Sequence, residues 1–137
     1  MEIRGPLGHT ATFVASGDMN TDALQFRFVQ QAAGVNNDVF IATTSGSPAI
    51  VGVNNDKVTN NQHVRVVYEG LTKIRLASSL GAAIWLTTDA AGFAIQYTGQ
   101  SGAASLGRLI TGATSGSPGE MTFHKSPNTN SLAIIQN

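Results

Sequence analysis

The sequence has no cysteine and little charge. Without cysteine, neither disulfides nor thiolate-bound metals can stabilise the fold. Charged residues make up 12% of the 137-residue chain, which is low against the ~25% of ordinary globular domains. Eight basic and eight acidic residues cancel. Asp56 and Glu69 dilute the densest basic segment, which holds Lys57, Arg65, Lys73 and Arg75. Binding along nucleic-acid phosphates needs a basic field, so we expect no nucleic-acid partner.

Long apolar runs are also missing. No stretch approaches the ~18 residues that indicate a transmembrane helix, so we expect no membrane partner. The N-terminal residues MEIRGPLGHT contain no apolar core of a secretory signal. These absences predict a protein that is made in the cytoplasm and stays there or joins an assembly formed there.

Apolar and polar residues alternate along most of the chain, as is typical of half-buried strands. In HVRVVYE, for example, Val64, Val66 and Tyr68 share one face. The clearest alternating segments are ALQFRFVQ (23–30), HVRVVYE (63–69) and LTKIRLA (71–77). Shorter candidate strands lie at 10–15, 38–43, 49–53, 83–87, 92–97, 105–111 and 120–124. Helix is expected only as a single turn, near 20–24 or 77–83.

Glycine, asparagine and aspartate separate these segments. Turn signals every ~8–12 residues between short strands favour a small sandwich or barrel. We therefore predict an all-β, single-domain β-barrel or sandwich with extended arms: an N-terminal arm (1–9), a β domain (10–124) and a C-terminal tail (125–137). The tail ends in the apolar run SLAII (131–135), which we expect to add a strand to its own sheet or to a neighbour's.

Thr-Ser-Gly-Ser-Pro occurs at 44–48 and again at 114–118. The string is similar to the nucleophile loop of chymotrypsin-like proteases, but Thr43 and Ala113 replace the glycine two residues before each serine. His63, Asp89 and Ser115 do follow the triad order, although a triad is defined by geometry and not by order. We predict two turns and no catalytic residues. A small β-fold peptidase that uses Ser45 or Ser115 is the enzyme alternative.

Gly-Val-Asn-Asn-Asp is also repeated, at 34–38 and 52–56. Such oxygen-rich loops can bind calcium, but each copy offers one carboxylate, Asp38 or Asp56. We favour two strand-connecting turns that flank a hairpin, and calcium binding stays an open alternative. The histidines lie too far apart in the sequence for a metal motif; they are His9, His63 and His124. No phosphate-binding loop is present. We expect no metal and no cofactor.

Three aromatic residues in the C-terminal half could together stack on a sugar ring; they are Trp85, Phe93 and Tyr97. Trp85 alternates with Ile84 and Leu86, so one face of a strand must hold it. Tryptophan is mostly buried in proteins. We therefore favour a place in the core or in a subunit interface for Trp85.

Several turn and strand patterns recur in a known order between residues 10 and 124. They are Val51-Gly52-Val53, Val64-Arg65-Val66, Gly70, Gly81, Trp85–Gly92 and Leu106-Gly107-Arg108-Leu109. This order resembles the small capsid-decoration, or cement, proteins of tailed bacteriophages. The resemblance implies a β-tulip-like barrel and a non-enzymatic protein on the outer capsid surface of the virion. Such a protein bridges subunits of the phage major capsid protein, commonly as a homotrimer, and stabilises the head.

A protein of this kind needs one surface that contacts the capsid and one that joins its copies. We expect the N-terminal arm to contact the capsid through Ile3, Pro6 and Leu7. We expect an oligomer interface formed by Trp85, Leu132, Ile134 and Ile135. Two alternatives share the all-β composition: a receptor- or carbohydrate-binding module of a phage tail or spike, and a structural subunit of the tail tube or head–tail joint.

Overall fold

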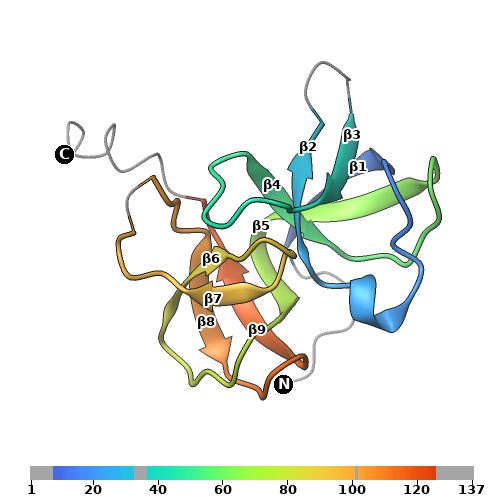
Figure 1. Cartoon of the computed structure of the whole chain (residues 1–137). Coiled ribbons are helices and arrows are strands. Elements are labelled where there is room, and N and C mark those ends of the chain that lie inside the picture. The colour runs from blue at the N-terminus through green and yellow to red at the C-terminus, as the bar shows by residue number, and fades with distance from the viewer. Residues whose placement is uncertain (1–7, 33–36, 101, 126–137) are drawn as a thin grey trace.

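The computed structural model describes residues 8–32, 37–100 and 102–125. Five strands close a barrel in the N-terminal half (Figure 1). They are β1 (His9–Ala15), β2 (Phe28–Gln31), β3 (Asp38–Ile41), β4 (Ile50–Asn54) and β5 (His63–Arg75). Their order is β1-β3-β2-β4-β5, and β5 pairs back onto β1. The pairing of β1 with β3 is parallel, and the other barrel pairs are antiparallel.

The long strand β5 belongs to two sheets. Residues 63–69 pair with β1, and from Gly70 onward the strand pairs with β9 (Pro118–Phe123). The second sheet continues through β8 (Gly107–Thr111), β6 (Trp85–Thr88) and β7 (Ala94–Gln96). A parallel bridge from Ala94 to Leu76, just beyond β5, curls this sheet back on itself. The molecule therefore consists of a closed barrel and a curled sheet that share one strand (Figure 1).

Two apolar clusters form the core. One fills the barrel and contains Ala15, Met19, Val29, Val39, Val64 and Val66. The other joins the barrel to the second sheet, where Phe28 packs against Phe123 with 6.2 Å between ring centroids. Large side chains from the barrel, such as Ile50, and from the second sheet, such as Leu86 and Met121, are fully buried in this second cluster. The apolar faces of two sheets thus cover each other, as a single domain requires.

The predicted all-β, single-domain barrel is confirmed, and so is the helical turn near residue 22, a 3₁₀ turn at Asp22–Leu24. Residues 77–83 contain no helix. In the described part of the chain, no helix is long and apolar enough to cross a membrane.

Three local predictions are wrong. Residues 24–27 do not alternate within a strand, because Phe26 takes a positive φ of 64° and β2 begins only at Phe28. Tyr68 does not share the buried face of Val64 and Val66; Val67 is buried in its place and Tyr68 is 47% exposed. The expected hairpin across residues 34–56 does not form, since β2 lies between β3 and β4.

Both Thr-Ser-Gly-Ser-Pro segments form turns, and their geometries match. Gly46 and Gly116 take positive φ values of 72° and 78°. The Gly46 N–H donates to Thr88 O, and the Gly116 N–H donates to Leu76 O. The serine hydroxyls donate to the ends of neighbouring segments: Ser45 Oγ to Thr88 O at 3.4 Å and Ser115 Oγ to Ala77 O at 2.9 Å. In both copies the serine therefore links its turn to the second sheet, at the end of β6 for Ser45 and just after β5 for Ser115.

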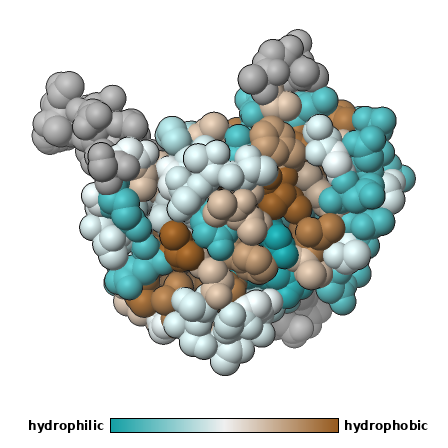
Figure 2. All heavy atoms as spheres, viewed as in Figure 1, coloured by the Kyte–Doolittle hydropathy of each residue, from teal (hydrophilic) through white to brown (hydrophobic). Residues whose placement is uncertain are grey.

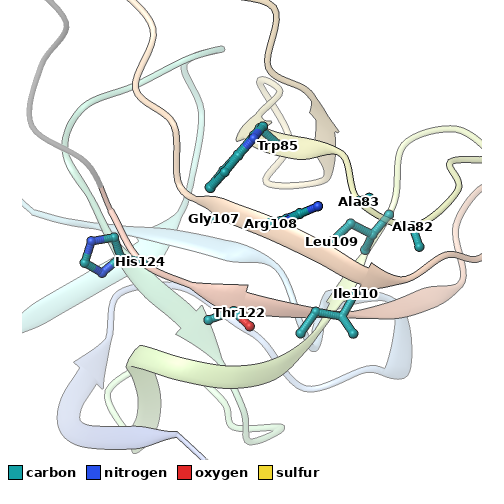
Figure 3. Close-up of a pocket in the computed structure, with 9 residues that line it drawn as sticks. All are labelled: Ala82, Ala83, Trp85, Gly107, Arg108, Leu109, Ile110, Thr122 and His124. Atoms are coloured by element: carbon teal, nitrogen blue, oxygen red, sulfur yellow. The ribbon is translucent and has the colours of Figure 1, made fainter.

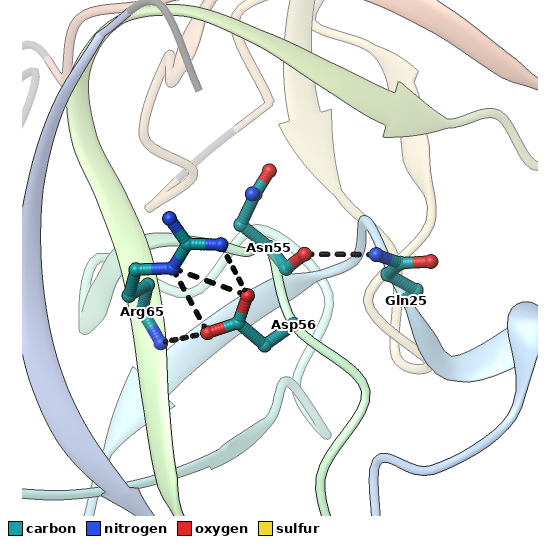
Figure 4. A network of polar contacts seen from close by, with 4 residues as sticks. All are labelled: Gln25, Asn55, Asp56 and Arg65. Carbon is teal, nitrogen blue, oxygen red and sulfur yellow. Dashed lines mark hydrogen bonds and ion pairs between the residues drawn. The ribbon is translucent and has the colours of Figure 1, made fainter. Parts of the chain in front are cut away.

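The prediction that the second Gly-Val-Asn-Asn-Asp copy forms a turn is wrong in part. Gly52, Val53 and Asn54 lie inside β4, and the chain leaves the strand only after Asn54. Asp56 then forms an ion pair with Arg65, at 2.7 Å between Oδ1 and Nη2 (Figure 4). The Arg65 backbone N–H also donates to Asp56 Oδ2 at 3.0 Å. Asn55 O accepts a hydrogen bond from the Gln25 side chain at 2.8 Å (Figure 4).

The Asp56–Arg65 pair predicts a pH-dependent contribution to stability. Hydrogen bonds from the Arg65 side chain lower the pKa of Asp56. A folded-state pKa below the unfolded value of ~3.9 stabilises the fold above pH ~4, and this contribution disappears as the pH falls through the lowered pKa. We expect Asp56→Asn to reduce the free energy of unfolding by about 1 kcal/mol at pH 7, after solvent screening.

Urea unfolding from pH 7 to pH 2.5 measures this difference, which should shrink steadily below pH ~4. Asp22→Asn is the matched control, because Asp22 pairs with Lys57 on the open surface, with 84% of the carboxylate side chain exposed. Its effect on stability should be smaller than that of Asp56→Asn at every pH, because solvent screens an exposed ion pair. A difference for Asp56→Asn that stays constant with pH would show that the ion pair contributes nothing.

Candidate interaction surface

The outer face of the second sheet carries a row of exposed and half-buried side chains in direct register. Trp85 on β6 lies opposite Arg108 on β8, and Arg108 lies opposite Thr122 on β9. The row ends on β5, where Leu71 pairs with Thr122. Side chains on one face of paired strands lie within reach of one another. The register therefore builds one continuous surface from residues that are far apart in the sequence.

An open groove of about 510 Å³ lies over this row (Figure 3). We call it the Trp85 groove. Its lining residues are Ala82, Ala83, Trp85, Gly107, Arg108, Leu109, Ile110, Thr122 and His124. The lining is mainly apolar, with Arg108, Thr122 and His124 as its polar groups. This combination of an apolar surface and a few polar groups is typical of binding clefts.

A bulge in β8 creates the apolar floor beside Arg108. The register with β9 shifts between Leu109 and Thr111, so Ile110 is an extra residue in the strand. Bulges bend a strand and re-aim a side chain. Ile110 is 46% exposed, whereas Leu109 next to it is fully buried. The Ala83 N–H donates to Leu109 O at 2.7 Å, which holds the loop that forms the far wall.

Trp85 borders the groove and is 51% exposed. The Arg108 guanidinium carbon lies 5.8 Å from its ring centroid, a cation–π arrangement. Among the ion pairs of the described residues, none involves Arg108. At the groove's other end, His124 Nδ1 lies 3.4 Å from Glu69 Oε2, and both side chains are exposed. On the face shown in Figure 2, hydrophobic residues are interspersed with polar ones.

Trp85 is therefore not a core residue, although its place at a subunit interface stays a prediction. Large aromatic side chains that are half-exposed beside an apolar groove are typical of interaction sites. The other predicted contact residues, Ile3, Pro6, Leu7, Leu132, Ile134 and Ile135, lie outside the described residues. Sequence reasoning missed Ile110 and Arg108. The sequence held one sign of this surface. Leu109 and Ile110 are adjacent apolar residues, and in a strand adjacent side chains point to opposite faces, so both cannot be buried on the same face.

The candidate catalytic groups are engaged elsewhere. Ser115 Oγ donates to Ala77 O, and Asp89 Oδ1 accepts the backbone N–H groups of Ala91 and Phe93. Within residues 8–32, 37–100 and 102–125, no three carboxylate or histidine side chains gather as a metal site. Asp56, one of the two calcium candidates, is already paired with Arg65.

The basic segment is also committed to intramolecular contacts. Lys57 pairs with Asp22, and Arg65 pairs with Asp56. The Lys73 ammonium lies 5.7 Å from the Phe26 ring centroid, and Arg75 donates to the backbone oxygens of Gln25 and Gly116. These four cations therefore tie β5 and its neighbouring loop to the fold.

The fold and this surface define a small all-β domain with an exposed apolar groove. No family model matches the chain, and no curated protein matches it. Among solved structures, the chain is similar to the head fiber gp8.5 N base in bacteriophage phi29. The TM-score is 0.56 at 14% sequence identity, and the match covers 85% of this chain and 93% of that chain. At this identity the likeness establishes a shared fold.

Proposed function

We propose that this protein is a non-enzymatic structural component of a phage head that binds the outer surface of the assembled capsid. The observation that carries the proposal is the likeness to the phi29 head fiber N base over nearly the whole of both chains. The strand and turn patterns that resemble capsid-decoration proteins support the same role independently. The neutral composition and the exposed Trp85 groove suit a protein that works through shape-complementary contacts.

Decoration stabilises a head by thermodynamic linkage. A protein that binds the assembled shell, and not the dissociated subunits, shifts the equilibrium toward the shell. In this proposal the protein is a homotrimer that bridges neighbouring major capsid protein subunits, and each trimer gains avidity from three linked contacts. The N-terminal arm, with Ile3, Pro6 and Leu7, contacts the capsid, while Trp85, Leu132, Ile134 and Ile135 join the copies.

The test is rebinding to particles that have been stripped of this chain. The number of bound copies per major capsid protein is measured by mass spectrometry for the full chain and for a chain without residues 1–7. This deletion leaves β1 whole, because β1 begins at His9. We expect near-stoichiometric binding of the full chain and almost none of the deleted chain.

A matched control replaces only the polar or charged arm residues, Glu2→Gln and Arg4→Gln, and should bind like the full chain. Undiminished binding of the deleted chain would remove the arm from the contact. Fewer than about one full-length copy per thirty capsid subunits would exclude decoration and favour a joint or tail subunit, whose closed symmetry limits its copy number.

The exposure of Trp85 favours a second candidate function, carbohydrate binding. An exposed indole beside Arg108 in an open groove can stack on a sugar ring, as a carbohydrate-binding module of a tail or spike requires. A glycan array separates the two functions, since a decoration protein should bind no glycan on it.

A further inference from the structure

We propose that the C-terminal tail of one copy binds in the Trp85 groove of a second copy, with the apolar run 131–135 on the groove floor. This inference rests on the oligomer in the proposed function and identifies its contact. It starts from two features of the same chain: an apolar groove that the described residues leave open, and an apolar run that follows the described residues.

The place where the tail leaves the domain favours exchange between copies. His124 lines one end of the groove, and the last described residue is Lys125. Because Arg108 lies opposite Thr122 and Leu109 opposite Met121, the groove extends backward along β9 from His124. A chain that continues in the direction of β9 therefore moves away from its own groove, which leaves that groove open to the tail of a second copy.

The lengths and chemistry of the two surfaces agree. The groove follows β8 from Gly107 to Ile110, which is about 13 Å at ~3.3 Å per residue. The five residues of the run span about 16 Å when extended, and the five linker residues before it can reach roughly as far. Residues 126–137 contain no charged side chain, so the tail can enter the groove without burying an unpaired charge.

The sheet itself limits how the tail can bind. On either side of the groove β8 and β9 already have strand partners, in the order β5-β9-β8-β6. The tail therefore lies on the face and is held by its side chains, chiefly against Trp85 and Ile110. The groove and the tail are different surfaces, so the contact is head-to-tail and can close into a ring of three copies.

Trans-complementation between two full-length variants tests this arrangement. The tail variant carries Leu132→Asp and Ile134→Asp, and the groove variant carries Ile110→Asp at an exposed position. Each alone should associate at least about thirtyfold more weakly than the native chain, the effect expected at an interface hot spot. Their mixture should form a complex of one copy of each, because one intact groove and one intact tail remain. Analytical ultracentrifugation measures the masses.

Matched controls separate specific contacts from added charge. Asn130→Asp with Gln136→Asp places two charges on the tail outside the apolar run, and Tyr68→Asp places one on exposed β5 outside the groove. Both controls should associate like the native chain. Circular dichroism verifies that every variant folds.

Three results would overturn the inference: a full-length chain that stays monomeric, variants that associate like the native chain, or a mixture that forms no complex. If the chain is monomeric and the tail substitutions shift the emission of the single tryptophan, Trp85, to the red, the tail binds its own groove. A monomer that still binds particles would overturn this inference and the proposed homotrimer, but not the capsid role. Tail–groove oligomers that do not bind particles would overturn only the capsid role.

Discussion

Gly107→Ala should destabilise the domain by about 3–5 kcal/mol, through backbone strain and overpacking together. Gly107 opens β8 with a φ of +146°, which side chains rarely adopt. A β-carbon there would lie 2.1 Å from Thr122 O and 2.6 Å from Met121 Cε. Neither the β9 backbone nor the buried Met121 can move without disturbing the core. β8 and β9 would have to separate beneath the Trp85 groove.

Urea unfolding, followed by the fluorescence of Trp85, measures this effect. Gly81→Ala is the matched control, because a β-carbon at Gly81 meets no atom within 4 Å. Its free energy of unfolding should stay within ~0.5 kcal/mol of the native value. If Gly107→Ala changed the free energy of unfolding as little as Gly81→Ala, the close approach of β8 and β9 at Gly107 would be contradicted.

Asn54→Ala should cost about 2–4 kcal/mol, because it leaves two polar backbone groups without their partners. Asn54 is completely buried at the end of β4. Its Oδ1 accepts the Arg27 N–H at 2.7 Å, and its Nδ2 donates to Leu24 O at 2.8 Å. This amide therefore holds the irregular segment at Phe26, where alternation fails, against the barrel.

The neighbouring residue provides the control. Asn55 contacts Arg65 and Gln25 through its backbone N–H and carbonyl groups, which Asn55→Ala retains. That substitution should change stability by less than ~0.5 kcal/mol. Equal losses for the two variants, measured by thermal or urea unfolding, would contradict the assigned role of the Asn54 side chain.

The sequence by itself determined the local features of this protein. Alternation predicted most strands, and the all-β class followed from it. The two Thr-Ser-Gly-Ser-Pro turns were predictable because glycine, serine and proline act on the backbone within a few residues. The alternation predicted in LTKIRLA (71–77) is confirmed: Thr72, Ile74 and Leu76 are buried, and Lys73 and Arg75 between them are not, since this half of β5 is regular.

Only the tertiary structure decided which strands are neighbours and which faces are covered. No local signal places β2 between β3 and β4 or closes β5 onto β1, because pairing depends on the burial of distant side chains. The exposure of Tyr68 follows from the barrel register, and that of Trp85 from the second sheet. The Trp85 groove exists because β6, β8 and β9, from separate parts of the chain, align their outer residues across a bulge at Ile110.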